Sequence, residues 1–400
     1  MRLDRALPWL IGTLFALVPL YPAFITLTGV TVPGVSLVSR DATIALLTCG
    51  ALIDAALFAA LVRAPRERMP TLLPLAAWLA AALVAAAFGF SPAAGLIFLG
   101  IYALSLVWHA AVLRFYRHTP AYEPVQWMIA LSCAAASAAA LVMAALKRPA
   151  ELYAIAHGRA VGTFVLPGEL AGYLIVVLPF LFALWRQSES RALRAACATA
   201  LLVGLAAFVL TFSRAGWIGL AAAAACYAIW NGRIRRRYAP LIVAAGVIAV
   251  LALFNVRHNP AENFTRLSIW QAALSMIRRF PLTGVGPFDF ARIYPLVRVP
   301  GGDAQAFHAH DVVLTMFAET GVLGVAALAW VWWRFAAELR LRLRSADPRS
   351  AALALALAAG LAGTWVQGLI DTVSVVIFGL WLPAMALTLA IAGTPAQERA

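Results

Sequence analysis

The chain has 400 residues, of which 64% are hydrophobic and 12% are charged, and its formal net charge is +14. Soluble domains have about 45–50% apolar and about 25% charged residues, so a soluble fold is excluded and lipid must surround most of the chain. In a soluble protein this charge would suggest a nucleic-acid partner. In a membrane protein it reports orientation, because cytoplasmic loops collect Lys and Arg. The four cysteines lack CxxC spacing, so we expect no disulfide framework and no metal site.

Apolar runs long enough to cross a bilayer, about 20 residues each, recur along the whole chain. The first run is longer than the core of a signal peptide, about 7–15 residues, and predicts an uncleaved span. The predicted spans are 7–28, 42–62, 71–90, 93–113, 124–145, 166–185, 193–212, 215–231, 239–255, 311–333, 351–371 and 374–393. We therefore expect an all-α integral membrane protein of about twelve transmembrane helices, with residues 1–400 forming a single polytopic domain.

The distribution of arginine predicts the orientation of these spans. If the N-terminus is cytoplasmic, the even-numbered loops should be basic, and they are: Arg63, Arg66 and Arg68; Arg114 and Arg117; Arg186, Arg191 and Arg194; Arg233, Arg235, Arg236 and Arg237; Arg334, Arg340, Arg342, Arg344 and Arg349. The short outer loops near 29–41, 88–93 and 371–374 have almost no basic residues. The alternation predicts that both termini are cytoplasmic, and we expect the membrane to be the inner one.

Two predicted outer segments are basic, 146–165 and the long loop 256–310 between spans nine and ten. The long loop has six arginines (Arg257, Arg266, Arg278, Arg279, Arg292 and Arg298) against three acidic residues. Long loops translocate largely regardless of charge, so the orientation stands. An anionic substrate would explain this charge, and so would solubility or contact with acidic lipid headgroups. We expect this periplasmic loop to contain part of the active site.

Within the long loop, residues 266–279 have the period of an amphipathic helix. Apolar side chains fall on one face, namely Ile269, Trp270, Ala273, Leu274 and Ile277. Such a helix suits a position along the membrane surface or across the end of a bundle. Pro281 ends it, and the segment Thr283-Gly-Val-Gly-Pro predicts a tight turn.

Two arginines are candidates for binding an anion. Arg214 lies at the outer junction of two spans, and its guanidinium presents a fork that fits phosphate oxygens. The helix that follows would also aim N–H groups at an anion. Arg266 opens the amphipathic helix, where a cation opposes the helix dipole unless an anion is bound. The simpler alternatives are a snorkelling arginine for Arg214 and an ordinary exposed one for Arg266.

A histidine and a carboxylate flank the start of the tenth span. His310 is the candidate general base, because histidine accepts protons near neutral pH. His308 is expected to be structural, and no third ligand stands at a spacing that would make the pair a metal site. Glu319 lies within the span, where pairing with an arginine or a helix end would give it a supporting role.

Several motifs of other enzyme classes are missing from the sequence. The sequence has no Walker A segment, no GxSG serine element, and no intracellular domain large enough for a nucleotide sugar. An outward-facing transferase would need a donor that is already activated and already carried across the membrane. A glycan linked to a lipid pyrophosphate meets both conditions, and no cofactor is expected.

Three segments taken together resemble the O-antigen ligase and polymerase superfamily. They are Ser213-Arg214-Ala-Gly-Trp217; Arg266-x-x-x-Trp270-x-x-Ala273 followed by Pro281-Leu-Thr-Gly-Val-Gly286; and His310-Asp311-x-x-Leu314-x-x-x-Ala318-Glu319-Thr-Gly321-x-x-Gly324. Two departures stand out. Asp311 replaces the usual Asn after the histidine, and the family's Pro-Asn element is degraded to Pro167-Gly168-Glu169.

The resemblance implies a metal-independent, inverting glycosyl transfer in the periplasm. The donor would be a glycan on undecaprenyl pyrophosphate, and the acceptor would be lipid A–core oligosaccharide. By matching position, Arg214 and Arg266 would hold the pyrophosphate and His310 would activate the acceptor hydroxyl. Glu319 and Asp311 would support the site, and Arg298 would meet acidic sugars or phosphates.

The same motifs also occur in O-antigen polymerases and protein O-oligosaccharyltransferases. These enzymes differ from the ligase in their acceptor, which is another lipid-linked repeat or a protein hydroxyl. A transporter of lipid-linked sugars is the alternative from another class. It would place charged residues near mid-membrane in related repeats, whereas here the candidate residues gather at the outer face.

Overall fold

The computed structural model describes residues 2–20, 40–65, 69–116, 122–148, 150–164, 166–232, 235–238, 241, 244–246, 248, 260–345, 348–369, 371 and 381–392. The regular elements of this part of the chain are helices: α1 (Arg2–Ala16), η1 (Val18–Leu20), α3 (Arg40–Arg63), α4 (Leu72–Ala87), α5 (Pro92–Phe115), α6 (Tyr122–Leu146), α7 (Ala150–Ile155), α8 (Pro167–Gln187), α9 (Arg191–Leu210), α10 (Arg214–Trp230), η3 (Arg236–Tyr238), α12 (Pro260–Arg279), α13 (Phe290–Val297), α14 (Val312–Ser345), α15 (Pro348–Gly368) and α16 (Trp381–Ile391).

The helices fall where the hydropathy of the sequence predicts them. A helix is found at eleven of the twelve predicted spans, and the ninth, 239–255, lies mostly outside the described residues. Among the described helices, five are long and apolar enough to cross a membrane: Glu123–Leu146, Pro167–Gln187, Arg191–Leu210, Val312–Arg344 and Pro348–Gly368. Shorter apolar helices cover Ala6–Leu20, Leu72–Ala87 and Tyr102–Phe115. The described part of the chain is therefore all-helical, and the protein is a multi-pass membrane protein.

The first predicted span is shorter than expected. Its α-helix ends at Ala16 and a 3₁₀ turn follows over Val18–Leu20. Pro19 lies in that turn, and proline cannot donate the backbone hydrogen bond that would continue the helix. The rest of the predicted span, 21–28, lies outside the described residues.

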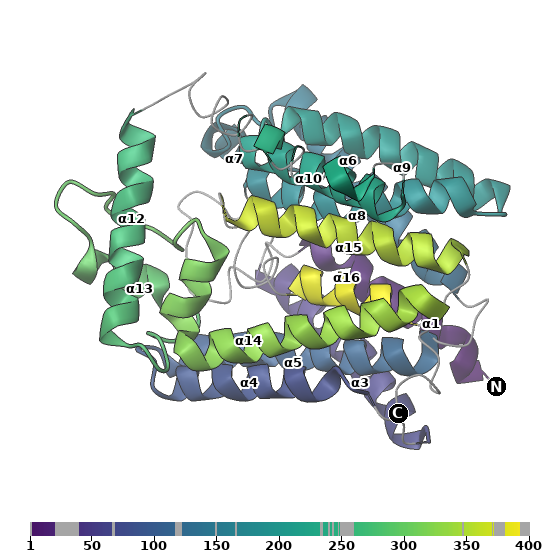
Figure 1. Cartoon of the computed structure of the whole chain (residues 1–400), viewed down its shortest axis with the longest axis horizontal. Helices are drawn as coiled ribbons and strands as arrows, with labels where there is room; N and C mark the ends of the chain where they lie inside the picture. Colours follow the sequence, from purple (N-terminus) through teal and green to yellow (C-terminus); the bar gives the residue numbers. More distant parts are fainter. Residues whose placement is uncertain are drawn as a thin grey trace.

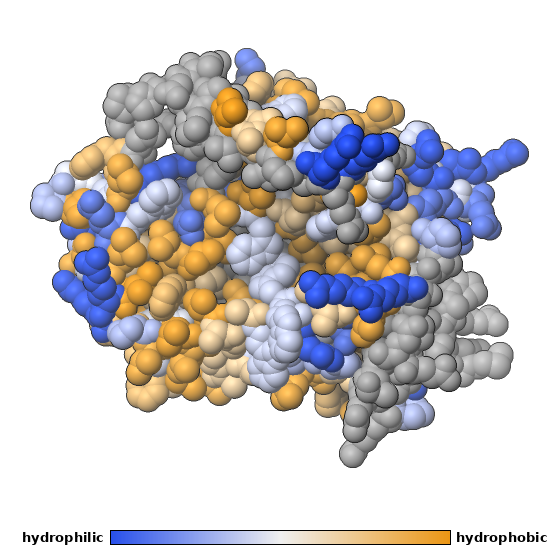
Figure 2. Space-filling view, viewed as in Figure 1, coloured by the Kyte–Doolittle hydropathy of each residue, from blue (hydrophilic) through white to orange (hydrophobic). Residues whose placement is uncertain are grey.

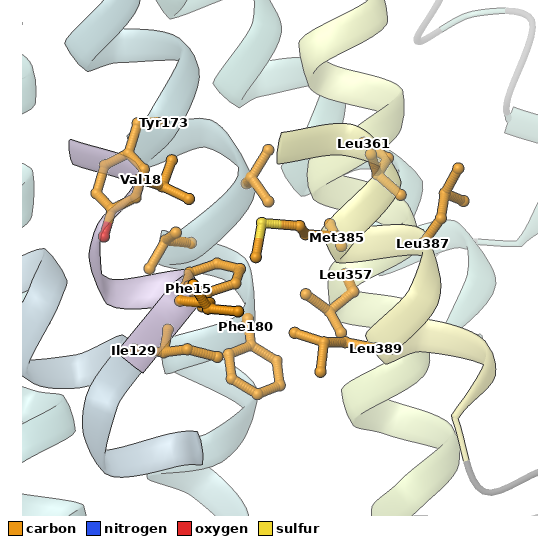
Figure 3. Close-up of a cluster of buried hydrophobic side chains, with 14 of the residues drawn as sticks. Phe15, Val18, Ile129, Tyr173, Phe180, Leu357, Leu361, Met385, Leu387 and Leu389 are labelled. Carbon is orange, nitrogen blue, oxygen red and sulfur yellow. The ribbon is translucent and has the colours of Figure 1, made fainter. Parts of the chain in front are cut away.

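The bundle is packed around α8 and α15. Figure 3 shows their side chains interlocked with those of α1, α6 and α16, among them Phe15, Ile129, Phe180, Leu357 and Met385. Small residues let neighbouring helices approach closely: a Cβ on Gly219 of α10 would lie 2.8 Å from the carbonyl oxygen of Gly363 of α15. Such close packing is how helices associate in lipid, where apolar burial between them gives little driving force.

The long loop covers one end of this bundle. Figure 1 shows α12 at the left, running across the direction of α4, α14 and α15, with α13 beside it. The face in Figure 2 is largely hydrophobic, with hydrophilic side chains concentrated at its left edge and in its right half. At the end opposite α12, Arg349 forms an ion pair with Glu189 at 3.2 Å, joining two of the predicted cytoplasmic loops.

The amphipathic helix of the loop differs in detail from its prediction. It begins at Pro260, six residues before Arg266, because proline suits the first helical position. Ile269 and Ala273 are buried as expected, whereas Leu274 is 41% exposed. Met276 and Ala272 are buried instead, because α13 and the start of α14 pack against a face rotated from the predicted one.

The tenth span is broken, although the sequence predicts one continuous helix. Gly321 (φ 62°, ψ −167°) divides α14 into a short limb, 312–320, and a long limb, 322–345. The turn after α12 fills the break. Val285 N–H donates to Ala318 O at 2.8 Å, and Val322 N–H donates to Pro281 O at 2.9 Å. Backbone groups released by the kink thus find partners, as apolar surroundings require.

Candidate active site

The turn that carries His310 is held by contacts on both sides. Trp270 Nε1 of α12 donates to Ala309 O at 2.9 Å, and Ala309 N–H donates to Thr315 Oγ1 at 3.0 Å. His310 itself adopts a left-handed backbone conformation with φ 53°. This conformation is uncommon for a residue other than glycine and is costly unless its surroundings hold it. The fold therefore fixes the place from which the imidazole projects.

Asp311 caps the helix that follows. Its Oδ1 accepts from Leu314 N–H at 2.9 Å, and its backbone oxygen accepts from Thr315 Oγ1 at 2.8 Å. A side-chain oxygen in this position satisfies one of the unpaired N–H groups of a helix start. The oxygen of an Asn amide would do the same, so replacing the family's Asn by Asp preserves the cap.

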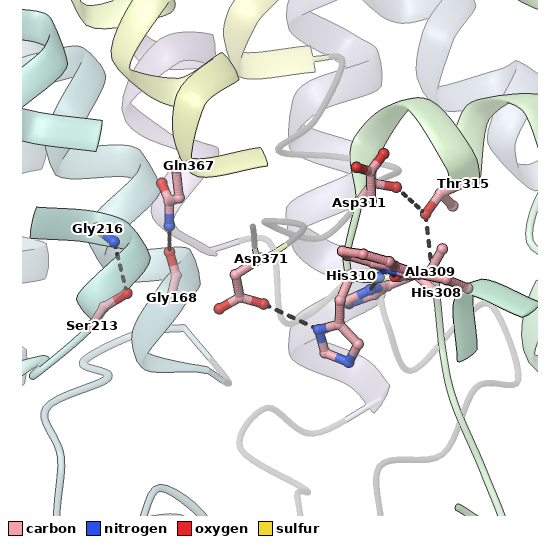
Figure 4. A network of polar contacts seen from close by, with 11 residues as sticks. Gly168, Ser213, Gly216, His308, Ala309, His310, Asp311, Thr315, Gln367 and Asp371 are labelled. Atoms are coloured by element: carbon pink, nitrogen blue, oxygen red, sulfur yellow. Dashed lines mark hydrogen bonds and ion pairs between the residues drawn. The ribbon is translucent and has the colours of Figure 1, made fainter. Parts of the chain in front are cut away.

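His310 meets a carboxylate from another part of the chain. Its Nδ1 lies 3.1 Å from Oδ1 of Asp371, which follows the end of α15 (Figure 4). Each side chain is about a third exposed, 33% for His310 and 31% for Asp371. An ionised carboxylate can only accept, so Nδ1 carries the proton of the neutral imidazole and the lone pair is on Nε2.

The charges around Asp371 keep it ionised. Burial raises the pKa of its carboxyl, but the hydrogen bond and charge of His310 together with the charge of Arg266 outweigh burial. The net pKa therefore lies below its ordinary value of 3.8. Arg266 is thereby placed in the electrostatic neighbourhood of the dyad formed by His310 and Asp371.

His308 supports the same turn in its neutral form. Its Nδ1 accepts from His310 N–H at 3.1 Å, and the two rings stand edge to face with centroids 4.5 Å apart. Burial lowers the pKa of His308 to about 3, and the neighbouring charge of His310 acts in the same direction, whereas Asp371 opposes it. The geometry agrees with the structural role expected for this residue.

The start of α8 forms the opposite wall. Gln367 Nε2 donates to Gly168 O at 2.8 Å (Figure 4). A Cβ on Gly168 would lie 3.0 Å from Oδ2 of Asp371, so glycine leaves room for that carboxylate. Glu169 caps its own helix, accepting from Leu166 N–H at 3.2 Å. The segment that looks degraded in sequence thus fits closely around the dyad.

Arg214 is the first residue of α10, at the same end of the bundle. Ser213 precedes it and caps the helix, with Oγ accepting from Gly216 N–H at 3.1 Å (Figure 4). A Cβ on Gly216 would lie 2.8 Å from Cβ of Ala171, which ties the start of α10 to the start of α8. Helices α8, α10 and α14 all begin at this end, where their unpaired N–H groups favour an anion.

The remaining predicted residues lie at the edges of this region. Glu319 is 3% exposed and its carboxylate takes hydrogen bonds from the backbone N–H groups of Phe288 and Phe290, at the start of α13. It therefore binds a helix end, one of the two partners expected for it. Arg298 is exposed and donates to the backbone oxygens of Gly302 and Asp303 at 3.3 and 3.4 Å, away from the dyad.

Sequence reasoning assigned no role to Asp371, Gln367 or Asp289. Asp289 is fully buried and accepts from Ser91 N–H at 2.7 Å, which anchors the loop to the turn between α4 and α5. The only signal for Asp371 was its place near the outer end of a span, as a carboxylate flanked by apolar residues. Its partner could not be read from spacing along the chain.

Comparison with known proteins agrees with the motifs. Residues 199–329 match the family model described as O-antigen ligase, a range that includes Arg214, Arg266, His310 and Glu319 but not Asp371. No curated protein matches the chain. Members of this family are enzymes of the glycosyltransferase kind that use lipid-linked glycans. The match over residues 199–329 therefore agrees with the resemblance to the O-antigen ligase and polymerase superfamily that the three motifs predicted.

Proposed function

We propose that the protein is an O-antigen ligase. It would move glycan from undecaprenyl pyrophosphate to lipid A–core oligosaccharide on the periplasmic face of the bacterial inner membrane, a step of lipopolysaccharide maturation. The observation that supports this most directly is the contact of His310 with Asp371 inside a basic, helix-capped end of a domain related to O-antigen ligases. The twelve-span arrangement with cytoplasmic termini belongs to the same proposal.

In the proposed reaction, Nε2 of His310 takes the proton of the acceptor hydroxyl. The acceptor oxygen then bonds to the anomeric carbon of the donor from the face opposite the pyrophosphate, and the bond from that carbon to the pyrophosphate oxygen breaks. Inversion at the anomeric carbon follows from this single displacement. Asp371 holds the proton on Nδ1 and stabilises the imidazolium that forms, as a carboxylate does in other histidine-dependent enzymes.

The leaving pyrophosphate keeps the bonding electrons, so negative charge develops there. In the proposed scheme Arg214 and Arg266 hold it by bidentate hydrogen bonds. The three helix starts add partial positive charge at the same end of the bundle. Fixed positive groups of this kind stabilise the charge that appears in the transition state. No metal ion is needed in this scheme, because the arginines neutralise the pyrophosphate.

The acceptor distinguishes the ligase from its close alternatives. A polymerase would use another lipid-linked repeat, and a protein O-oligosaccharyltransferase would use a protein hydroxyl, with the same donor site. The described part of the long loop, α12 and α13, is compact. We prefer the ligase because a compact outer loop is typical of ligases within the superfamily. A transporter of lipid-linked sugars is disfavoured, because it would place charged residues near mid-membrane in related repeats, whereas His310, Asp371 and the start of α10 lie at one end of the bundle.

The deciding experiment is transfer by purified protein in detergent. Undecaprenyl-pyrophosphate-linked glycan and lipid A–core are supplied with EDTA and without ATP. His310→Asn is the test variant, because asparagine tolerates the left-handed backbone of this position. His157→Asn is the matched control, since His157 also has a positive φ, 51°, and lies in the loop after α7.

We expect wild type and His157→Asn to glycosylate lipid A–core, and His310→Asn to be slower by about 10²–10⁴-fold. Elongation of the lipid-linked donor without transfer to lipid A–core would show a polymerase. Transfer to neither acceptor would contradict both readings and favour a protein O-oligosaccharyltransferase or a transporter.

A further inference from the structure

An exposed aromatic ring lies beside the start of α10. Phe212 stands one residue before the cap Ser213 and two before Arg214, and its side chain is 60% exposed. Its backbone is left-handed, with φ 44°. For a bulky residue this conformation is a genuine outlier, and it persists only where the surroundings impose it. A strained backbone thus presents an apolar ring at the surface.

Hydrogen bonds on both sides hold this backbone in place. Ser213 N–H donates to Oγ1 of Thr211 at 3.3 Å. Leu210 O accepts from Ala160 N–H at 2.9 Å, which ties the turn to the loop after α7. The fold therefore fixes the direction in which the side chain of Phe212 leaves the chain.

The usual structural role of an apolar residue at this position is filled by another side chain. The residue before a helix cap often packs against the fourth residue of the helix, which here is Trp217. Trp217 instead meets Phe208 edge to face, with ring centroids 5.2 Å apart, and Phe208 is buried. Within the described residues, Phe212 takes part in no ring contact. The helix start is thus packed without the ring of Phe212.

Exposure to lipid or water alone does not explain the strained backbone. The exposed phenylalanines in the described part of the chain are Phe58, Phe88, Phe90, Phe212, Phe264 and Phe307. Of these, Phe212 alone has a positive φ. The others show that a ring can be exposed from an ordinary backbone. A fixed and costly direction is expected where a ring must meet one ligand.

We propose that Phe212 stacks against the sugar that is bonded to the pyrophosphate of the donor. This inference rests on the proposed function and adds a contact for the glycan that is transferred. Consecutive Cα atoms are about 3.8 Å apart, so the Cα atoms of Phe212 and Arg214 lie within about 8 Å of each other. In the proposed scheme Arg214 holds the pyrophosphate, which places the first sugar within reach of the ring. The start of α10 also packs on the start of α8, which borders the dyad (Figure 4).

The chemistry of the ring selects a sugar over the other parts of the donor. One face of a pyranose consists mainly of C–H groups with partial positive charge, and the face of an aromatic ring is negative. Stacking removes both apolar faces from water and leaves the sugar hydroxyls at the edge, where they keep their hydrogen bonds. A phosphate over the ring would be repelled by its negative face. A stacked sugar would also have its anomeric carbon held in one position relative to Nε2 of His310.

The test compares a donor lipid with and without a sugar. Phe212→Asn removes the ring and suits the left-handed backbone, which asparagine tolerates, whereas Phe212→Tyr keeps the ring. Phe88→Asn is the matched control, because Phe88 is 75% exposed in the turn after α4. Binding to purified protein in detergent is measured with undecaprenyl pyrophosphate carrying one N-acetylglucosamine and with glycan-free undecaprenyl pyrophosphate.

We expect wild type, Phe212→Tyr and Phe88→Asn to bind the sugar-bearing lipid about 3- to 10-fold more tightly than the glycan-free lipid. Phe212→Asn should lose this difference, with an unchanged Kd for the glycan-free lipid. A difference that persists in Phe212→Asn would overturn the proposal, as would its absence in wild type. Equal weakening of both lipids would also overturn it, because the residue would then act through Arg214.

Thermal unfolding shows whether the ring belongs to the core. Phe212→Asn should unfold no lower than wild type, because no packing is lost and the strain is relieved. A clear fall in the midpoint would identify Phe212 as a structural residue and reject the contact. Binding is measured without an acceptor, so loss of the sugar preference in Phe212→Asn would support the contact even if lipid A–core were not glycosylated. Conversely, transfer to lipid A–core together with an unchanged preference in Phe212→Asn would leave the proposed function and reject this contact alone.

Discussion

Asp371 and His310 are 61 residues apart in the chain and are joined by a hydrogen bond of 3.1 Å between Oδ1 and Nδ1. The bond connects the end of α15 to the turn before α14, two elements that also touch at Gly368 and Val312. It fixes both the orientation of the imidazole and the nitrogen that carries its proton. A base that must meet an acceptor hydroxyl in one geometry needs both.

Asp371→Asn should therefore reduce turnover while the fold persists. An amide can present its N–H to Nδ1, which would move the ring proton to Nε2 and remove the base. We expect kcat to fall by about 10²–10⁴-fold with little change in KM for either substrate. Steady-state kinetics on lipid A–core measures the two constants separately. A normal kcat would show that the carboxylate has no part in the chemistry.

Arg214→Lys and Arg266→Lys should each weaken donor binding although the charge is kept. An ammonium group cannot reproduce the two parallel hydrogen bonds of a guanidinium. The loss of one charged hydrogen bond corresponds to about a 10- to 100-fold rise in Kd. Binding of glycan-free undecaprenyl pyrophosphate measures this without turnover. Arg278→Lys, at an exposed position near the end of α12, is the control and should bind normally. Equal affinity in all three variants would argue against bidentate holding.

The positions of most described helices could be predicted from the sequence because lipid makes composition decisive. An apolar run of sufficient length has few alternatives to a helix in a bilayer. His310 and Arg214 could be singled out for the same reason, since polar side chains at the ends of such runs stand out. The ends of helices were less certain, as the early stop before Pro19 shows.

Contacts between distant segments could not be predicted in this way. The pairing of Asp371 with His310, and of Asp289 with Ser91, depends on how helices pack. The buried face of α12 was predicted from apolar side chains alone, and Leu274 proved exposed because α13 and α14 cover a different face. The break in α14 was missed because glycine is common in transmembrane helices and does not bend them by itself.

Gly321→Ala should destabilise the protein more than a Gly→Ala substitution at a position where the added Cβ meets no other atom. The backbone at Gly321 (φ 62°, ψ −167°) lies in a region open essentially to glycine alone, and an added Cβ would overlap the backbone of Leu282. Strain alone costs about 1–3 kcal/mol, and the overlap would also displace the turn that fills the break. The measurement is the thermal unfolding midpoint in detergent, with transfer activity.

Gly232→Ala separates the two effects, because Gly232 has a φ of +72° with nothing within 4 Å of an added Cβ. In that variant the thermal unfolding midpoint should fall through backbone strain alone, and transfer activity should be unchanged. Equal destabilisation in the two variants would mean that the contact between Gly321 and Leu282 is unimportant.

His308 should make the fold sensitive to mild acid. Its pKa is lowered to about 3 by burial, whereas an unfolded histidine titrates near 6.5. Between these values the unfolded chain binds a proton that the folded protein does not, so the free energy of unfolding falls as the pH is lowered through this window. From pH 7.5 to pH 5 the loss of unfolding free energy from His308 alone is at most about 2 kcal/mol.

His308→Asn should remove this loss, because an asparagine oxygen can accept from the backbone N–H two residues on without titrating. Thermal unfolding at the two pH values compares wild type, His308→Asn and the control His157→Asn. If His308→Asn loses as much stability in acid as the other two proteins, the sensitivity arises elsewhere, with the neighbouring His310 as the first residue to replace.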